Sequence, residues 1–500
     1  MSLLSKQNLP PAHNIDVPSE NIFSLPEKVL QFGTGVLLRA LPDFFIDKAN
    51  KQNLFNGRVV VVKSTGGSNP DFTEQNCLYT TVIKGIENGE VTEETVVNAA
   101  ISRVLTAKQD WEEILKCARN EHFKIIISNT TEVGIIMSDD KVTDTPPASF
   151  PGKILAFLYE RFKIFQGGKD SGMVIVPTEL ITDNGKVLRD IVITLAKQNN
   201  LEPGFIEWLQ KNNYFCNSLV DRIVPGKLPS EEHKATEAAL GYEDNLMIMA
   251  EPFRLWAIEV QNEQVKTILS FAKADEGVVL TNDIHKFKEL KLRLLNGTHS
   301  LSCALAILSG FITVKEAMND KAFSGFVQQL VFDELAIATA TGDISLDEAK
   351  HFAAKVLDRF RNPFLEHKWN SIALNYTSKI KARDIPLLKK YYAIKNKPPQ
   401  HFVLGFAAYL LFMHTENKDG KYVKSVQGKE YILQDEDAGE LYDLWQKHDA
   451  KNLVNAVLQD QKLWGEDLTQ YAGFADTVNK SLHALLENGA GNTIEKLINN

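Results

Sequence analysis

Short apolar runs alternate with amphipathic stretches over the first half of the chain. Residues 28–32 and 58–63 are two such runs, and the second holds four consecutive valines. Runs of this kind are typical of strands buried on both faces of a parallel sheet. Further strands are expected at 124–128 and at 173–176, where Pro177 follows. Strands that alternate with helices predict a doubly wound α/β domain.

Helix signals lie between these runs. Apolar residues recur at helical spacing from Val36 to Phe45, directly after the first strand. Asp110 and Glu113 stand three residues apart, as the two partners of a capping box do, and they predict a helix that begins there.

After Thr281 the pattern changes to that of a mainly helical protein. The β-branched runs disappear, and leucine and alanine recur at helical spacing over 301–308 and 402–413. Capping boxes and helix-forming residues predict three further helix starts, at Thr313 with Glu316, at Ser345 with Glu348 and at Ala438.

The length supports the same division, because 500 residues exceed one ordinary hydrophobic core. We place the boundary at 275–285, which gives an α/β domain over 1–280 and an all-α domain over 281–500. Ligand clefts commonly form at such a seam, so an active site is expected between the two domains.

Composition and charge narrow the class of partner. The chain is 44% hydrophobic and 24% charged, as in ordinary soluble proteins. Its net charge of −9 argues against nucleic acid or an anionic membrane as the main partner, although local lysines can still bind a small anion. No stretch reaches the roughly 20 apolar residues of a membrane span, and the amino terminus does not read as an export signal. Nothing in the sequence indicates the oligomeric state.

The cysteines are scattered and show no metal-ligand spacing, so no metal site is expected. We interpret them as reduced core thiols of a cytoplasmic protein; they are Cys77, Cys117, Cys216 and Cys303.

A glycine-containing turn follows the first strand. Gly33-Thr34-Gly35 precedes a helix, and glycines there let backbone amides approach a pyrophosphate. The third glycine of the usual motif is Leu38, so an unrelated strand-to-helix turn stays an alternative. The acid expected to bind a ribose after the second strand is missing. Lys63 could meet a 2′-phosphate and Ser64 or Thr65 a ribose hydroxyl, which leaves both NAD and NADP open.

A second polar segment ends the strand at 124–128. Asn129, Thr130 and Glu132 lie where the carboxyl ends of parallel strands face a ligand crevice, so they are candidates for cofactor binding. The alternative is a turn in which such side chains cap the next helix.

Lys291, Asn296 and His299 bring a base, a two-way hydrogen bonder and an imidazole onto one short segment. If the segment is α-helical, Asn296 lies about 140° and His299 about 80° around the axis from Lys291, on one broad face. A lysine is a useful base only where burial or a positive neighbour lowers its pKa, and Leu292 and Leu295 could bury this one. The alternative is a solvated lysine beside a buried histidine.

Four motifs are spread along the chain, and they are Gly33-x-Gly35-x-x-x-Arg39, Val220-Asp221-Arg222-Ile223, Glu251-Pro-Phe-Arg-Leu-Trp256 and Lys291-x4-Asn296-x2-His299. Together they resemble the motifs of the mannitol dehydrogenase family of long-chain polyol dehydrogenases. Within the family, Ser128-Asn-Thr-Thr-Glu132, Thr178-Glu-Leu-Ile181 and Ser371-Ile-Ala-Leu-Asn375 are similar to the altronate oxidoreductase, or tagaturonate reductase, branch.

The resemblance implies an amino-terminal Rossmann-type domain, a helical domain and an NAD-dependent reaction of hexuronate catabolism. Hydride would pass between D-altronate and the cofactor, with Lys291 as acid and base, Asn296 on the reacting oxygen and His299 orienting the substrate. Asp221 would hold a neighbouring hydroxyl. The implied cofactor contacts are Phe32, Gly33, Thr34, Gly35, Arg39, Ser64, Asn129, Thr130 and Glu132.

The chain departs from the mannitol branch at three positions. Leu180 stands where the mannitol branch has an asparagine that holds the reacting oxygen. Lys288 stands in place of an acid, and Ser371 stands in place of a substrate-binding arginine. A sugar acid also needs a cation for its carboxylate, and the candidates are Arg254, Lys379 and Arg383. A solvated basic helix face is the alternative for the last two. Fructuronate reduction or polyol oxidation stays open as an alternative activity, and a nucleotide-binding protein without catalysis is less well supported.

Overall fold

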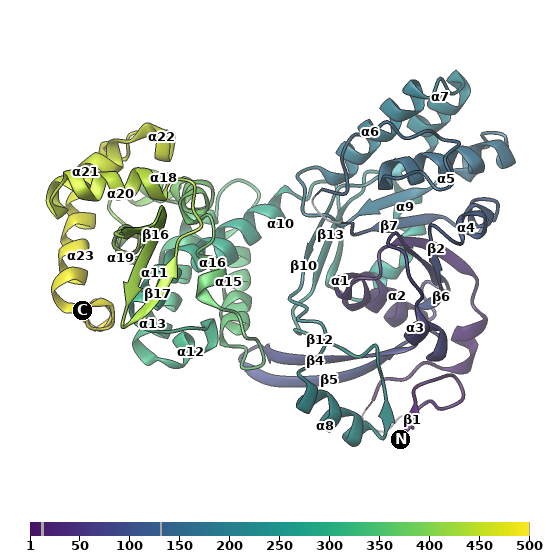
Figure 1. Cartoon of the computed structure of the whole chain (residues 1–500), viewed down its shortest axis with the longest axis horizontal. Helices are drawn as coiled ribbons and strands as arrows, with labels where there is room; N and C mark the ends of the chain where they lie inside the picture. The colour runs from purple at the N-terminus through teal and green to yellow at the C-terminus, as the bar shows by residue number, and fades with distance from the viewer. Residues whose placement is uncertain (12–14, 131–132, 500) are drawn as a thin grey trace. The chain divides into compact units, whose positions relative to one another are not determined.

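The structure is a computed structural model that describes residues 1–11, 15–130 and 133–499 (Figure 1). The chain forms two compact units. The first comprises Met1–Lys84 and Val91–Ile284, and the second comprises Gly85–Glu90 and His285–Asn500.

A six-stranded sheet in the order β6-β3-β2-β7-β8-β9 forms the centre of the first unit. Every neighbouring pair in it is parallel. Numbered along the chain, these strands follow the order 3-2-1-4-5-6 of the dinucleotide-binding Rossmann fold, and the order reverses between β2 and β7. The strands are β2 (Glu27–Phe32), β3 (Arg58–Lys63), β6 (Ile101–Thr106), β7 (Ile125–Ser128), β8 (Val174–Pro177) and β9 (Tyr214–Phe215). The Rossmann fold and the four predicted strands are confirmed.

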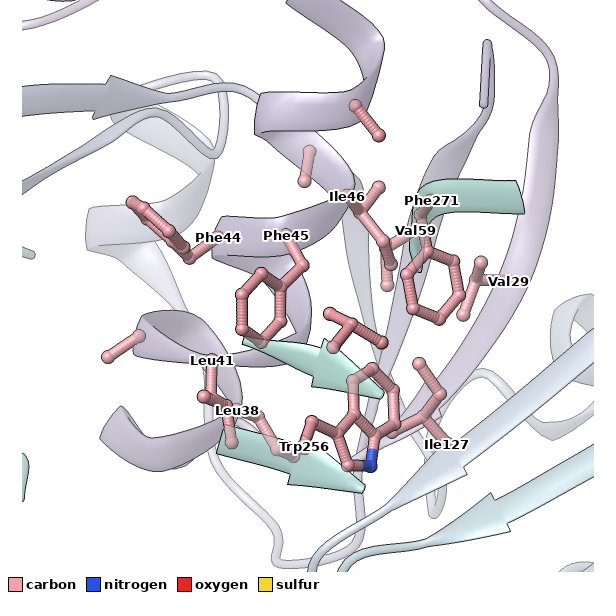
Figure 2. Packing of buried hydrophobic residues seen from close by; sticks show 14 of the residues in the cluster. Val29, Leu38, Leu41, Phe44, Phe45, Ile46, Val59, Ile127, Trp256 and Phe271 are labelled. Atoms are coloured by element: carbon pink, nitrogen blue, oxygen red, sulfur yellow. The ribbon is translucent and has the colours of Figure 1, made fainter. Parts of the chain in front are cut away.

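Alternate residues of each strand face opposite sides of this sheet. Leu30 and Val60 pack with α4 (Trp111–Ala118), α5 (Phe150–Phe165), α6 (Asn184–Gln198) and α7 (Pro203–Asn212). Val29 and Val59 pack on the other side with α1 (Val36–Ala40), α2 (Pro42–Lys51), β13 (Leu255–Glu259) and η3 (Ser270–Ala274). Figure 2 shows this second cluster, in which the rings of Trp256 and Phe271 stack 5.4 Å apart.

Smaller elements surround the central sheet. β10 (Ser218–Asp221), β13 and β14 (Val278–Thr281) form one sheet, β12 (Ile248–Ala250), β4 (Tyr79–Glu87) and β5 (Glu90–Asn98) another, and β1 (Ser2–Leu3) pairs with β11 (Tyr242–Glu243). The remaining helices of this unit are η1 (Glu20–Ser24), α3 (Pro70–Glu74), η2 (Lys169–Ser171), α8 (Ser230–Leu240) and α9 (Glu263–Ile268).

The second unit is mainly helical, as predicted. Its first helices are α10 (His285–Leu290), η4 (Lys291–Asn296), α11 (Gly297–Leu308), α12 (Val314–Asn319), α13 (Lys321–Gln329), η5 (Leu330–Leu335), α14 (Ala336–Thr339), α15 (Leu346–Arg361) and α16 (Trp369–Ile372). Then follow α17 (Tyr376–Lys379), η6 (Ile380–Asp384), α18 (Ile385–Lys395), α19 (Gln400–Phe412), α20 (Ala438–Lys447), α21 (Ala450–Gln459), α22 (Gln461–Trp464), η7 (Leu468–Gln470), α23 (Phe474–Asn488) and α24 (Ala490–Ile498).

Helices α11 and α19 form the buried centre of this unit. They approach closely, since a Cβ on Gly405 would lie 2.4 Å from the Leu301 carbonyl oxygen. A three-stranded antiparallel sheet of β15 (Glu416–Lys418), β16 (Lys421–Val426) and β17 (Lys429–Ile432) follows α19, where no strand was predicted.

The predicted helix starts at Asp110, Thr313, Ser345 and Ala438 are confirmed, whereas two details of the local predictions were wrong. Thr313 with Glu316 and Ser345 with Glu348 form the predicted capping boxes. Asp110 precedes α4 but does not cap it, because its carboxylate instead accepts a hydrogen bond from the Thr106 amide at 2.7 Å. The single helix expected over 36–45 is two helices, which meet at Leu41 with Pro42 beginning the second.

Candidate active site

The turn between β2 and α1 lies at the point where the strand order reverses. Gly33 has φ +129°, and a Cβ there would lie 2.8 Å from Leu38 Cδ1 and 3.0 Å from the Asn129 carbonyl oxygen. Leu38 is fully buried, so the missing side chain of Gly33 makes room for it. At Gly35 a Cβ would meet no atom within 4 Å. The open backbone at Gly35 fits a pyrophosphate that approaches the turn.

Arg39 lies in the interior of the first unit. Its Nη1 donates to the Leu246 carbonyl at 2.6 Å, and its guanidinium lies over the rings of Phe72 and Tyr79. Burial lowers the pKa of Arg39. Through these contacts Arg39 ties α1 to Leu246, which precedes β12, and to Phe72 and Tyr79.

A polar network joins the ends of β7 and β8. The Asn129 amide donates to the Thr178 hydroxyl at 2.9 Å. The buried carboxylate of Glu179 accepts from the Ser128 hydroxyl at 3.1 Å and from the Thr130 amide at 2.8 Å. Glu179 was not among the predicted site residues, although it stands in the Thr178-Glu-Leu-Ile181 motif. It fixes the backbone next to the cofactor candidates Asn129 and Thr130.

Three other candidates of the first unit differ in their surroundings. Ser64 is exposed directly after β3. Asp221 is buried at the end of β10. Arg254 donates through Nε and Nη2 to one oxygen of the buried Asp275 carboxylate, at 2.9 and 2.8 Å. Glu132 lies outside the described residues. Phe32 is the last residue of β2, and Thr34 follows Gly33 in the turn after it.

Lys291 and Asn296 are the first and last residues of a π-helical turn, η4, inserted between α10 and α11. Its i→i+5 hydrogen bonding places Asn296 one turn above Lys291. The angle of 140° expected for an α-helix is therefore wrong for this segment. Both side chains are half-buried, and Leu295 between them is buried. π-helical turns occur frequently at functional sites.

His299 lies one turn further on, in α11, and is buried. Its ring stacks on Phe360 at 4.1 Å and meets His367 edge-on at 5.1 Å. Burial, and then the nearby His367 and Arg359, hold the pKa of His299 well below its usual value, so the ring is neutral. A ring nitrogen donates to the Leu295 carbonyl. Nε2 has no hydrogen-bond partner among the described residues, and in this tautomer it is an acceptor.

Lys379 and Arg383 form a cationic pair on the adjoining helical segment α17–η6. Lys379 Nζ donates to the Ile372 carbonyl at 2.8 Å, and Arg383 Nη1 donates to the Ser300 hydroxyl at 3.1 Å. Burial, and then the charge of Arg383, lower the pKa of Lys379. Among the described residues, neither cation forms a carboxylate ion pair like that of Arg254. The structure thus brings Arg383 near the Asn296–Ser300 turn, while Arg254 belongs to the other unit.

Within the described part of the chain, no helix is long and apolar enough to cross a membrane. No group of three or more His, Cys, Asp or Glu side chains there is arranged to hold a metal ion. All four cysteines are buried and unpaired.

Two family models cover most of the chain. Residues 27–270 match the mannitol dehydrogenase Rossmann domain, and residues 283–486 match the mannitol dehydrogenase C-terminal domain. The chain belongs to the mannitol dehydrogenase family.

Several curated relatives are similar to this chain over nearly their full length. The chain is 37% identical to an altronate oxidoreductase of Halalkalibacterium halodurans over 95% of this chain and 94% of the relative. It is 36% identical to an altronate oxidoreductase of Bacillus subtilis, with 94% of this chain and 95% of the relative covered. An altronate oxidoreductase of Yersinia enterocolitica is 38% identical, with 93% of this chain and 96% of the relative covered.

Two solved structures share the fold of this chain. A D-sorbitol dehydrogenase superposes with a TM-score of 0.75 at 21% identity, over 99% of this chain and 100% of the other. Mannitol 2-dehydrogenase of Pseudomonas fluorescens, solved with NAD and D-mannitol, gives 0.66 at 20% identity, over 99% of each chain.

Proposed function

We propose that this chain is an NAD-dependent altronate oxidoreductase, which interconverts D-altronate and D-tagaturonate. Relatives of that name, 36–38% identical over nearly the whole length, support the substrate. The observation that carries the chemistry is the segment 291–299, where a half-buried lysine, an asparagine and a neutral histidine follow one another. The proposal includes a role in hexuronate catabolism in the cytoplasm, where buried unpaired cysteines would stay reduced.

The Gly33–Gly35 turn and the Asn129–Thr130 segment would hold the nicotinamide cofactor. When bound, the cofactor accepts or returns the hydride. The free space over Gly35 gives the pyrophosphate an approach to the backbone. Ser64, exposed after β3, would contact the adenine-side ribose, which favours NAD, although Lys63 leaves NADP as a second candidate.

Lys291 is the proposed base. As the neutral amine it takes the proton of the secondary hydroxyl in the oxidation of altronate, and as the ammonium it returns that proton to the carbonyl oxygen of tagaturonate. Asn296, one π-helical turn above, donates its amide hydrogen to the same oxygen.

His299 orients the substrate in this mechanism. Because one ring nitrogen donates to the Leu295 carbonyl, the buried Nε2 can only accept a hydrogen bond. A hydroxyl of the substrate supplies that hydrogen. The low pKa of His299 keeps Nε2 available as an acceptor throughout the neutral range. Asp221 is the proposed partner of a further hydroxyl.

Lys379 and Arg383 are the proposed cations for the substrate carboxylate. Their half-buried positions strengthen a charge interaction relative to the surface. Arg254 is the weaker candidate because Asp275 already neutralises it. Mannitol has no carboxylate, so this pair separates a sugar-acid enzyme from a polyol enzyme.

Steady-state kinetics with altronate, mannonate and mannitol, each with NAD and NADP, test the assignment. We expect the highest kcat/KM with altronate and NAD. Preference for mannonate would instead assign fructuronate reduction, and preference for mannitol would assign a polyol dehydrogenase. Turnover of none would leave a nucleotide-binding protein.

Replacing Arg383 by glutamine tests the carboxylate site. We expect KM for altronate to rise at least about 30-fold, because a partly buried charge-assisted hydrogen bond contributes roughly 2 kcal/mol. Lys381→Gln is the matched control, since that exposed lysine on the same turn donates to the Lys462 carbonyl. Equal KM values for the two variants would remove Arg383 from the carboxylate site.

A further inference from the structure

Two π-helical turns of the second unit, η4 and η6, hold each other by reciprocal hydrogen bonds. Arg293 of η4 donates from Nη1 to the carbonyls of Ala382 and Arg383, at 2.7 and 2.8 Å. Arg383 of η6 donates back from Nη1 to the Asn296 carbonyl at 3.4 Å and to the Ser300 hydroxyl. A π-helical turn interrupts the regular ladder, so carbonyls near its end can accept from side chains. The two turns are therefore fixed to each other.

Asp384, the last residue of η6, packs against the middle of the proposed catalytic segment. Its side chain is fully buried. Its Oδ1 would lie 2.8 Å from a Cβ on Gly297, the residue that follows Asn296 and precedes His299 by two positions. Only a hydrogen at position 297 leaves room for this carboxyl group.

Hydrogen bonding does not explain the position of Asp384. Neither carboxyl oxygen makes a well-formed hydrogen bond among the described residues, and the Ser300 hydroxyl interacts with the carboxyl group only weakly. Ser300 lies close by, but its hydroxyl hydrogen goes to the Asn296 carbonyl at 3.0 Å. Burial holds the pKa of Asp384 well above its usual range, although Arg383 and Arg293 act in the opposite direction. A buried carboxyl group with so little hydrogen bonding is costly, so its place calls for a role other than stability.

We infer that Asp384 is a positioning residue, which through its packing on Gly297 fixes Asn296 and His299 relative to each other. The inference rests on the proposed function, in which both side chains bond the substrate. Asp384 itself touches neither the substrate nor the cofactor in this account. A wider residue at 297, or an empty space at 384, would shift the two contacts apart.

A double-mutant cycle at positions 297 and 384 tests this inference. We expect Gly297→Ala to lower kcat about 100-fold, the effect of a misplacement near 1 Å. Gly297→Ala/Asp384→Ala should recover at least about tenfold over the single variant, because the second change removes the atoms that the new methyl group meets. Gly491→Ala is the matched control in helix α24, where a Cβ would meet nothing within 4 Å, and its kcat should equal that of the wild type.

Thermal midpoints and NADH affinity, measured on the same variants, separate positioning from folding. A Gly297→Ala enzyme with a lowered midpoint but wild-type kcat, or a double variant no better than the single one, overturns the inference. If Gly297→Ala does not fold, Asp384→Asn, which keeps the shape, should retain about a third of kcat or more while Asp384→Ala loses about tenfold. An equal loss of kcat in Asp384→Asn and in Asp384→Ala also overturns the inference. If the wild-type enzyme is inactive on every sugar acid and polyol, the proposed function is refuted together with the inference. If the wild-type enzyme is active, the results with the variants bear on the inference alone.

Discussion

At the scale of single residues, buried polar groups without full hydrogen bonding stand out in both units. His299 Nε2 and both Asp384 oxygens belong to the proposed site, whereas Asp43 lies under the central sheet of the first unit. Asp43 is fully buried and its Oδ2 accepts from the Gln31 amide at 3.1 Å. Burial raises the pKa of Asp43 to about 7.

This pKa predicts how stability depends on pH. Because the folded value lies above the unfolded one, the protonated carboxyl stabilises the fold fully below about pH 4, and this contribution is lost as pH rises through 7. Asp43→Asn should therefore flatten the stability profile between pH 4 and 8 and gain at most about 4 kcal/mol at pH 8. Denaturant unfolding at a series of pH values measures it, and parallel profiles for variant and wild type would contradict the assignment.

At the scale of elements, the β2–α1 turn makes separate demands on its two glycines. Gly33 is required by its positive φ and by Leu38, whereas Gly35 has ordinary dihedral angles and free space around it. A role for Gly35 must therefore come from a ligand.

Gly35→Ala tests that role. We expect an unchanged thermal midpoint together with NADH affinity at least about tenfold weaker, because the added methyl group stands where the pyrophosphate approaches the backbone. Fluorescence titration with NADH measures the affinity, and Gly491→Ala again serves as the control. Wild-type affinity in Gly35→Ala would favour the alternative of an unrelated turn.

Local sequence patterns made some elements predictable from the sequence. The valines of 58–63 and the capping boxes at Thr313 and Ser345 were correctly interpreted, because each depends on neighbouring residues only. The hairpin of β4 and β5 was missed although Asn88-Gly89 is a strong turn signal. The π-helical turn at Lys291 could not be predicted, since its extra residue is accommodated by contacts with η6, nearly 90 residues away in sequence.

In the candidate site too, features that depend on neighbouring residues were predictable, whereas features that depend on distant contacts were not. The residue types of Lys291, Asn296 and His299 were visible in the sequence because they share one segment. Glu179 and Asp384 were not, because their roles depend on what packs beside them: Thr130 in one case and Gly297 in the other. Arg254 was a candidate by charge alone, and only the structure shows its ion pair with Asp275.

At the scale of the whole molecule, the two units carry different parts of the proposed chemistry. The turn for the cofactor belongs to the first unit, and the base, the oxygen contact and the carboxylate cations belong to the second. The net charge of −9 repels an anionic substrate in general, so the local cations Lys379 and Arg383 must overcome it. Added salt should accordingly change KM for altronate more than KM for mannitol.

In the proposed mechanism, the amine of Lys291 transfers the proton. The most direct measurement is kcat of Lys291→Ala for altronate oxidation, with NADH affinity checked on the same preparation and with methylamine added as an external base. We expect kcat to fall about 10²–10⁴-fold, methylamine to restore part of it, and the cofactor affinity to stay unchanged. A folded Lys291→Ala enzyme that binds NADH and turns over near the wild-type rate would contradict it.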